Sequence, residues 1–388
     1  MSFLFHMPIT SIIGENALRD TGPLILELGF KKALIVTDKV LHKELKATDP
    51  VIEMLNANGI EFEIFDKTVP NPTVKNVEDG LDKLSKYSCD FIISFGGGSP
   101  HDCAKGIAIV ATNGGNIRDY EGLNKCKVDA LPIVAINTTA GTASEITRFS
   151  IITDETRHIK MALVDWRMTP KIAVNDPALM VNMPKSLTAA TGMDALTHAV
   201  EAVVSTAANP ITDACAIKAI ELIFKHLKQV VSNGNDIFAR DQMVYAQYLA
   251  GMAFNNASLG YVHAMAHQLG GFYDLPHGIC NAILLPHVQR FNGMFSTDKF
   301  DLIAEAMGIS TASLSESEIV DSVVLSIHRL VHDVELPSSL SELGVKRDDL
   351  KTLATNALKD PCGLTNPKQA SLEEIIHIYE NAMNPPIL

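Results

Sequence analysis

The sequence contains no paired-cysteine motif. Its six cysteines include no C-x-x-C pair and follow no regular spacing; they are Cys89, Cys103, Cys126, Cys215, Cys280 and Cys362. This pattern is that of neither a disulfide framework nor a zinc knuckle. We therefore expect reduced thiols and a cytoplasmic protein.

Positive charge is also scarce. The 388 residues include 32 Lys and Arg against 45 Asp and Glu, so the formal net charge is −13. Proteins that bind nucleic acid need clustered Lys and Arg to neutralise phosphates. The composition therefore argues against nucleic acid as a partner.

Signal-peptide and membrane-span patterns are missing as well. Residues 1–8 contain neither a basic region nor a small-residue cleavage site. Residues 242–273 contain no Asp, Glu, Lys or Arg, but polar residues interrupt this stretch too often for a membrane span. The stretch indicates a buried helix, and we expect no membrane partner.

The first half of the chain alternates β-rich runs with helix-period segments. The β-rich runs are 33–37, 62–65, 91–95 and 133–136, and helical segments such as 77–86 and 101–111 lie between them. Strands and helices in this order predict a parallel sheet covered on both faces. Ligands of such sheets bind beyond the carboxyl ends of the strands.

The pattern changes near Asn182-Met183-Pro184, where a proline ends one pattern before the next begins. Long Ala-, Leu- and Met-rich helical patterns follow, for example 187–204, 211–231, 240–254 and 317–331. We therefore expect two domains: an α/β domain at 1–182 and an all-helical domain at 183–388.

A glycine-rich turn directly follows the third predicted strand. In Gly96-Gly97-Gly98-Ser99, glycines let the backbone approach an anionic group, and Pro100 is expected at the first position of the next helix. The free amides at that helix start can bind phosphate. The pattern departs from the G-x-G-x-x-G fingerprint, and a plain βα turn is the alternative.

Two further segments follow predicted strands in the same way. Asp38 ends the run 33–37, where a carboxylate can hold ribose hydroxyls and repel a 2′-phosphate; a loop or N-cap aspartate is the alternative. Residues 137–145 follow the fourth strand, and their hydroxyls could contact another part of a dinucleotide or simply cap a helix.

Five candidate metal ligands gather in the second half. Asp194 and His198 are four residues apart, His263 and His267 repeat that spacing, and His277 follows. A carboxylate and imidazoles one helical turn apart suit a divalent transition metal. A metal with an open coordination position can polarise a substrate oxygen.

Each pair of candidate ligands also has an alternative interpretation. Asp194 and His198 share a helix face with Thr197 and Glu201, and that face could be solvated. His263 and His267 could be core histidines with ordinary hydrogen bonds. The combination of one carboxylate, two histidines on an uncharged helix and a third beyond a turn favours a metal site.

Four segments together resemble the iron-containing (group III) alcohol dehydrogenases over nearly the whole chain. They are Gly96 to Asp102, Asn137 to Thr142, Ala190 to His198, and Gly260 to Gly278. The resemblance is strongest to the bacterial ethanol and 1,3-propanediol dehydrogenases. It implies a Rossmann-like α/β domain followed by an all-α metal-binding domain, a fold similar to that of dehydroquinate synthase.

The resemblance also implies roles for individual residues. It makes Asp194, His198, His263 and His277 the ligands of Fe²⁺, with Zn²⁺ as the alternative, and makes His267 a catalytic proton relay. The implied NAD contacts are Asp38, Asn71, Gly97, Gly98, Ser99, Asp102, Thr138, Thr139, Thr142, Lys160 and Leu179. The implied lining of the substrate pocket is Phe149, Phe254 and Cys362.

The implied activity is NAD-linked interconversion of small primary alcohols and aldehydes in a homo-oligomer, a dimer or larger. A polyol dehydrogenase, a lactaldehyde reductase or a cyclising lyase of the same fold is the first alternative. A metal hydrolase is the second, but it needs a carboxylate base beside the metal, and the helix of His263 offers none. A non-catalytic metal-binding protein is the third.

Overall fold

The computed structural model describes residues 3–157 and 159–384. The chain divides into two compact units, Met1–Val181 and Asn182–Leu388. The division lies one residue before the boundary expected from the sequence. Each unit has its own buried core, so each can be described by itself.

The first unit is built on a six-stranded parallel sheet with the order β1-β9-β6-β4-β2-β3. Its strands are β1 (Thr10–Ile13), β2 (Lys32–Val36), β3 (Glu61–Phe65), β4 (Phe91–Gly96), β6 (Ile133–Asn137) and β9 (Ile172–Asn175). The four predicted strands are β2, β3, β4 and β6. The winding reverses at β2, which has β3 on one side and β4 on the other.

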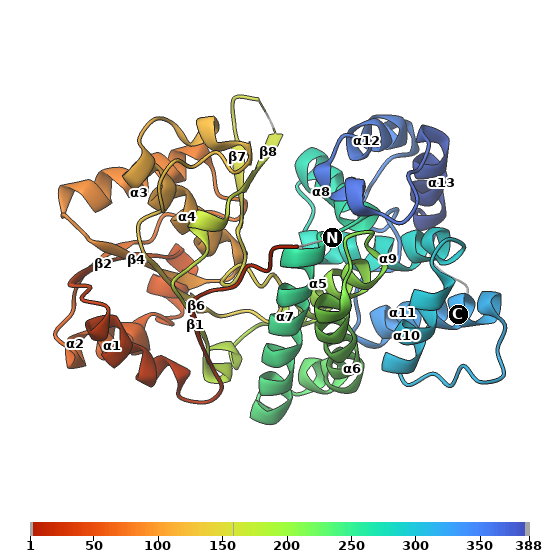
Figure 1. Ribbon diagram of the computed structural model, residues 1–388, viewed down its shortest axis with the longest axis horizontal. Coiled ribbons are helices and arrows are strands. Elements are labelled where there is room, and N and C mark those ends of the chain that lie inside the picture. The colour runs from red at the N-terminus through yellow and green to blue at the C-terminus, as the bar shows by residue number, and fades with distance from the viewer. Residues whose placement is uncertain (1–2, 158, 385–388) are drawn as a thin grey trace. The chain divides into compact units, whose positions relative to one another are not determined.

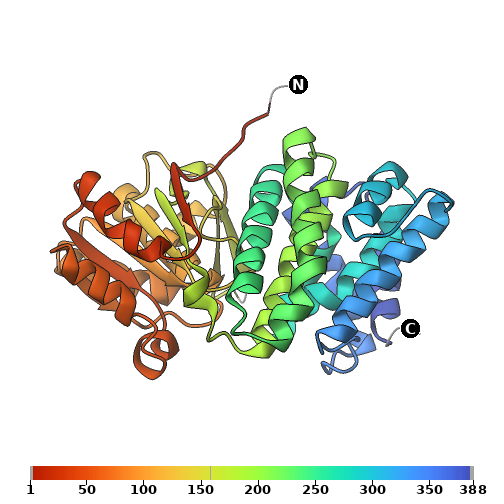
Figure 2. The same ribbon diagram turned by 90° about the horizontal axis from the view of Figure 1, so that it is seen from below.

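Helices cover both faces of this sheet (Figures 1 and 2). Alternate side chains of β2 enter different cores. Leu34 and Val36 pack in the core that contains residues of α3 (Val74–Lys86) and α4 (Gly98–Asn113). Ala33 and Ile35 belong to the core with residues of α1 (Ala17–Glu27) and α2 (Asp49–Ala57). Burial on both faces explains the uninterrupted apolar strand runs.

A second, three-stranded sheet was not predicted. It consists of β5 (Gly122–Leu123), β7 (Phe149–Asp154) and β8 (Ile159–Val164), in the order β5-β8-β7. Strands β7 and β8 pair antiparallel. Short helical turns complete the unit: η1 (Val40–Glu44), η2 (Ile117–Tyr120), η3 (Trp166–Met168) and η4 (Pro177–Met180).

The helix that follows the glycine-rich turn begins earlier than expected. Helix α4 starts at Gly98 with Gly97 as its N-cap, so Pro100 is the third helical residue and the expectation that it is the first was wrong. The first-turn N–H groups have no partner within the helix, so a residue without an N–H is tolerated throughout that turn.

The second unit is helical in the residues described, which together with the parallel sheet confirms the predicted fold class. Helices α5, α6 and α7 pack against one another (Figure 1). The helices are α5 (Lys185–Val204), α6 (Pro210–Ser232), α7 (Ile237–Ala257), α8 (Tyr261–Tyr273), α9 (His277–Gly293), α10 (Thr297–Ala306), α11 (Glu316–Asp333), η5 (Arg347–Asp349), α12 (Leu350–Ala357), η6 (Pro361–Thr365) and α13 (Leu372–Ala382).

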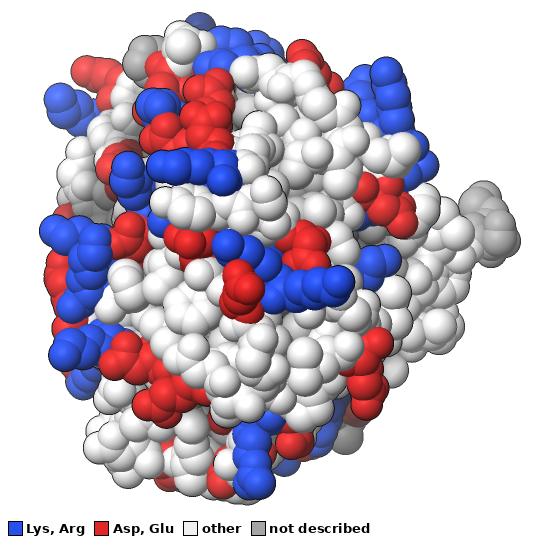
Figure 3. Space-filling model, turned by 90° about the vertical axis from the view of Figure 1, so that its left-hand side faces the viewer, with Lys and Arg blue, Asp and Glu red and all other residues white. Residues whose placement is uncertain are grey.

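Surface charge agrees with the acidic composition. On the face that Figure 3 shows, acidic and basic side chains are interspersed among uncharged ones and form no continuous basic surface. Among the described helices, none is both long and apolar enough to cross a membrane.

Candidate metal centre and nucleotide site

Helix α5 carries two of the predicted ligands on a buried face. Asp194 and His198 lie one turn apart and are only 3% and 4% exposed. Thr197 and Glu201, which share that face, are buried as well. The alternative that this is a solvated helix face is therefore wrong.

Three histidine nitrogens surround the Asp194 carboxylate. From its Oδ1 atom the distances are 3.9 Å to His198 Nε2, 3.8 Å to His263 Nε2 and 3.6 Å to His277 Nε2. His263 lies on α8, and His277 is the first residue of α9. The structure thus brings together the four side chains that the resemblance implies as ligands.

The hydrogen bonds of Asn281 test whether this cluster suits a cation. Its amide Nδ2 lies 2.7 Å from Asp194 Oδ1, 3.2 Å from His263 Nε2 and 3.1 Å from His277 Nε2. An amide group has two hydrogens and cannot donate to three acceptors. The Oδ1 atom of buried Asn281 accepts no hydrogen bond from residues 3–157 or 159–384. The cluster therefore has more acceptors than donors, as a divalent cation requires.

The protonation state of His263 agrees with that role. Burial, together with the neighbouring His198 and His277, holds the pKa of His263 well below its usual range. The ring is therefore neutral at physiological pH, the form in which imidazole binds a metal. Three imidazoles and a carboxylate suit Fe²⁺ and Zn²⁺ alike.

His267 lies next to this group but has a different partner. Its Nδ1 is 2.9 Å from Asp360 Oδ2, and its ring stacks on that of His277 with centroids 5.4 Å apart. Asp360 also caps η6 by accepting from the backbone N–H of Cys362. The structure therefore places His267 beside the candidate ligands, with its ring held by a carboxylate.

Glu201 contacts the ring nitrogen of His263 that does not face Asp194. Its Oε2 is 2.6 Å from His263 Nδ1, and its Oε1 accepts from the backbone N–H of Val262 at 2.7 Å. Burial raises the pKa of Glu201 to about 8, and the backbone N–H groups at the start of α8 act against that shift. A divalent cation on the other side of the His263 ring would also favour the ionised carboxylate.

Sequence reasoning missed three of these residues as parts of the site. Glu201 follows Asp194 by seven residues and Asn281 follows His277 by four, so helical spacing could have found both. Asp360 lies 93 residues from His267 in the chain. No local sequence pattern indicates that these two residues contact each other.

The three predicted pocket residues fall in different units. Phe254 on α7 is buried and stacks on the ring of His198, with centroids 4.1 Å apart. Cys362 lies in η6, and burial raises the pKa of its thiol well above its usual value. Phe149 begins β7 in the first unit, where its carbonyl accepts from Lys105.

The predicted nucleotide contacts of the first unit follow neighbouring strands. Asp38 comes after β2, Gly97 and Gly98 after β4, and Thr138 and Thr139 after β6. Because these strands are parallel neighbours, their carboxyl ends meet at one edge of the sheet. The winding reverses between β2 and β4, and such a switch point is where doubly wound sheets bind nucleotides.

The two glycines permit a close approach of neighbouring loops. A Cβ atom on Gly97 would lie 2.9 Å from Thr139 Cγ2, and one on Gly98 would lie 3.2 Å from Thr142 Cγ2. Larger residues would push the threonine loop away. The requirement for glycine therefore has a packing cause, and phosphate binding by this turn stays a prediction.

Asp102 and Lys105 tie α4 to the segment after β6. Asp102 accepts from Ser144 Oγ at 2.8 Å and from the backbone N–H of Ile151 at 3.2 Å. Fully buried Lys105 donates to the Ser144 carbonyl at 2.6 Å and the Phe149 carbonyl at 2.7 Å. These bonds hold the threonine segment in place, and a cofactor contact of Asp102 stays a prediction.

The remaining predicted contacts also lie in the first unit. Lys160 on β8 donates to Asn71 Oδ1 at 2.8 Å, and Asn71 has a left-handed backbone with φ 56°. Leu179 in η4 packs against the core on the α1 side of the sheet. Ser99 is the second residue of α4. Their contacts with a nucleotide stay predictions.

Asp38 takes the capping role that was its alternative interpretation. Its Oδ1 accepts from the backbone N–H of Leu41 at 2.8 Å, at the start of η1. The side chain is half-buried. A cap formed by one carboxylate oxygen is compatible with binding of a ribose by the other.

The chain matches two protein-family models that between them cover most of its length. Residues 8–177 match the model of the iron-containing alcohol dehydrogenases, and residues 188–383 match that of the C-terminal part of the same family. The chain belongs to the iron-containing alcohol dehydrogenase family. The resemblance drawn from its motifs is thereby confirmed, and the chain is an oxidoreductase.

Individual relatives of this dehydrogenase agree with that assignment. Alcohol dehydrogenase 4 of Schizosaccharomyces pombe is 53% identical over 98% of this chain and 89% of its own length. The NAD-dependent methanol dehydrogenase of Bacillus methanolicus is 45% identical over 98% and 99%. A crystal structure of 1,3-propanediol oxidoreductase matches with a TM-score of 0.97 and 48% identity, covering 99% of this chain and 100% of that one.

Proposed function

We propose that this dehydrogenase interconverts small primary alcohols and aldehydes, of the ethanol, propanol and 1,3-propanediol class, with NAD as hydride carrier. The observation that carries the proposal is the cluster of one carboxylate and three imidazoles, in which only the His277 side chain is part-exposed, with too few hydrogen-bond donors. Membership of the iron-containing family and the names of the relatives support the same reaction.

The side chains of Asp194, His198, His263 and His277 would hold Fe²⁺, or Zn²⁺ as the alternative. When bound, such a cation supplies Lewis-acid polarisation of the substrate oxygen, and NAD supplies the hydride acceptor. Asp194, His198 and His263 are buried, so most of the side chains that would hold this cation are shielded from water.

His267 is the proposed proton carrier. Its Nδ1 is engaged by Asp360, so Nε2 remains to exchange a proton with the substrate hydroxyl. Asp360 fixes the orientation of the ring in the same way as the carboxylate of a hydrolase triad. Phe254, stacked on His198, would present an apolar wall that favours short, unbranched substrates.

The first alternative is a polyol dehydrogenase or lactaldehyde reductase of the same fold. A more polar substrate would need polar side chains around it, and buried Phe254 favours the less polar substrate. The hydrolase alternative requires a carboxylate that acts as base for a water. The helix of His263 carries no carboxylate, but the structure places Glu201 and Asp360 nearby from other elements. Both already bind histidines, so neither serves as the base for a water.

A panel of small aldehydes tests the proposal. Protein purified without oxygen is analysed for metal, and NADH oxidation is measured with acetaldehyde, propanal, 3-hydroxypropanal, lactaldehyde and dihydroxyacetone. We expect highest kcat/KM for the unbranched aldehydes and activity proportional to bound metal. Preference for dihydroxyacetone would favour the polyol alternative, and absence of metal-dependent NADH oxidation would refute the proposal.

NAD preference is expected to depend on Asp38. A 2′-phosphate would bring like charge against this carboxylate and remove a charged hydrogen bond worth roughly 1.5–3 kcal/mol, so NAD should be preferred by about tenfold to a hundredfold. Asp38→Gly should abolish that preference in kcat/KM. Asp38→Asn is the matched variant, because an amide oxygen can still cap Leu41 while the charge is gone. An unchanged cofactor ratio in both variants would refute the role of Asp38.

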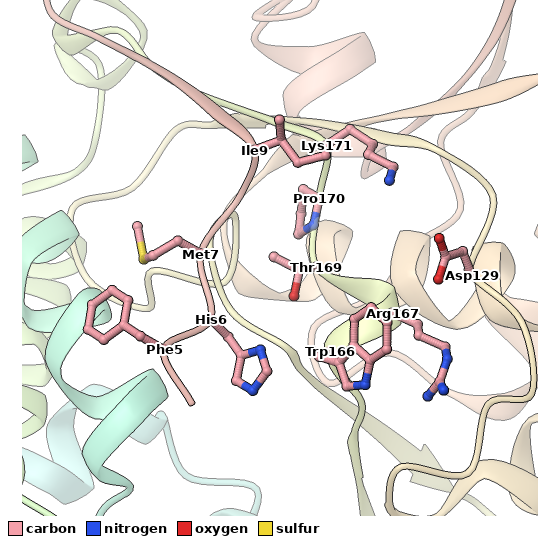
Figure 4. A pocket seen from close by; sticks show the side chains of 10 residues that line it. All are labelled: Phe5, His6, Met7, Ile9, Asp129, Trp166, Arg167, Thr169, Pro170 and Lys171. Carbon is pink, nitrogen blue, oxygen red and sulfur yellow. The ribbon is translucent and has the colours of Figure 1, made fainter. Parts of the chain in front are cut away.

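We further propose a homo-oligomer, a dimer or larger, that uses the edge strand β1. Apolar side chains before this strand are exposed, including Leu4 and Ile9 at 77% each. The same segment lines a pocket of about 190 Å³, beside Trp166, Arg167 and Lys171 (Figure 4). An exposed apolar patch at a sheet edge is typical of a protein interface.

Light scattering after size-exclusion chromatography tests this assembly. Ile9→Asp should lower the measured mass to that of one chain, because burial of a charge opposes association. Ile211→Asp is the control, since Ile211 is 50% exposed at the start of α6. A monomeric unmodified protein, or an unchanged mass for Ile9→Asp, would contradict the proposal.

We also propose that the protein is cytoplasmic. All six cysteines are free in the structure, and five of them are buried. Buried, unpaired thiols are typical of proteins from reducing compartments.

A further inference from the structure

We propose that Glu201 is a positioning residue of the metal centre, which fixes His263 in the tautomer that can bind a metal. The inference rests on the proposed function, because it assumes a cation at His263. Glu201 would not touch the cation or the substrate. It would act only through the imidazole ring between them.

Glu201 and His263 share a short hydrogen bond. Glu201 Oε2 is 2.6 Å from His263 Nδ1, and both side chains are at most 2% exposed. An ionised carboxylate, which the backbone N–H groups at the start of α8 favour, can only accept, so Nδ1 then carries the proton and the neutral ring has its lone pair on Nε2. That atom faces Asp194 Oδ1 at 3.8 Å, inside the candidate ligand group.

The Glu201 carboxylate also lies at the start of α8. The N-cap of this helix is Gly260, which has no side chain to cap it. Glu201 Oε1 fills that role by accepting from the N–H of Val262 at 2.7 Å. The helix start favours the negative charge, as helix N-termini generally do. The same bond fixes the carboxylate relative to the residue next to His263.

The packing around Gly260 shows that this space is kept for the carboxylate. A Cβ atom on Gly260 would lie 2.8 Å from Glu201 Oε1 and 2.8 Å from Asn366 Oδ1. Asn366 Oδ1 accepts from the N–H of Tyr261 at 3.3 Å. The first two N–H groups of α8 thus have separate side-chain acceptors, so Glu201 has one oxygen left for the histidine.

Glu201→Gln separates a helix-capping role from the tautomer role. The glutamine amide oxygen can still accept from Val262, but the –NH₂ group then faces His263 Nδ1. A donor at that place requires Nδ1 to accept, so the proton moves to Nε2 and points into the ligand group. A residue that only caps the helix would lose little by this substitution.

The experiment measures tautomer and metal affinity in the full-length protein. The metal-free protein is labelled with ¹⁵N-histidine, and the His263 signals are assigned by their loss in His263→Gln. Zn²⁺ affinity is then measured by competition with a chromophoric chelator. Glu318→Gln is the matched control, because Glu318 caps α11 by accepting from the N–H of Ser315.

We expect unmodified protein to show His263 protonated at Nδ1. Glu201→Gln should move the proton to Nε2 and raise the Kd for Zn²⁺ by about 10- to 100-fold, as loss of an outer partner does at metal sites. Glu318→Gln should leave both unchanged. An unmodified protein with the proton on Nε2 overturns the proposal, and so does a Glu201→Gln variant with unchanged Zn²⁺ affinity.

Two other outcomes of this experiment can also be interpreted. If Glu201→Gln does not fold, the tautomer of the unmodified protein alone decides between the two roles. If the unmodified protein does not bind Zn²⁺, or if His263→Gln leaves its Zn²⁺ binding unchanged, the proposed function fails. Normal Zn²⁺ binding that Glu201→Gln leaves intact refutes only the role of Glu201.

Discussion

His263→Ala is expected to lose the bound metal and to lower kcat/KM by about 10³-fold or more. The substitution removes a buried side chain that is one of four candidate ligands. Metal polarisation contributes several kcal/mol to the transition state, and about 4 kcal/mol corresponds to a factor of 10³. The measurement pairs metal analysis of the purified variant with NADH oxidation by propanal.

Two other histidines provide the comparison. His267→Ala should retain the metal and lose about 10²-fold in rate, because it removes a proton carrier and not a ligand. His377→Ala should behave like the unmodified protein, since this exposed side chain lies on α13. Full metal content and near-normal turnover in His263→Ala would show that the ligand assignment is wrong.

Gly278→Ala is expected to lower both stability and metal affinity. A Cβ atom at this position would lie 2.4 Å from the carbonyl oxygen of Ala190 and 2.8 Å from its carbonyl carbon. Ala190 precedes Asp194 by one turn of α5, and His277 is the neighbour of Gly278 on α9. A backbone atom cannot move away by changing rotamer, so α5 and α9 must separate, and their ligands with them.

We expect a loss of about 1–3 kcal/mol in unfolding free energy from the overpacking, together with at least about tenfold weaker Zn²⁺ binding. Thermal unfolding and chelator competition measure these effects. Gly271→Ala on α8 is the matched control, because a Cβ atom there meets nothing within 4 Å. It should be neutral or slightly stabilising, since alanine favours helix. Equal behaviour of the two variants would contradict the packing argument.

The main strands could be predicted from sequence because they are buried on both faces. A strand such as β4 is then a continuous apolar run that stands out between helical segments. The hairpin of β7 and β8 escaped prediction for the opposite reason. In β7 the buried side chains are Ser150, Ile152 and Asp154, while Phe149 and Ile151 are half-buried. Polarity therefore does not alternate with burial in this strand.

The candidate ligands could be predicted because helical spacing makes them neighbours before any tertiary structure is known. Their partners could not, except where the same spacing applies, as for Glu201 and Asn281. The pairing of His267 with Asp360 depends on how η6 packs beside α8. The close fit of Gly278 to Ala190 also depends on the packing of two helices, which no local pattern describes.

The most direct test of the metal centre is an Fe²⁺ titration of the metal-free protein without oxygen, followed by NADH oxidation with propanal. We expect activity to rise in proportion to bound Fe²⁺ and to reach its limit at about one ion per chain, as a single four-ligand site requires. Full activity of the metal-free protein, or activity that does not follow bound metal, would contradict this expectation.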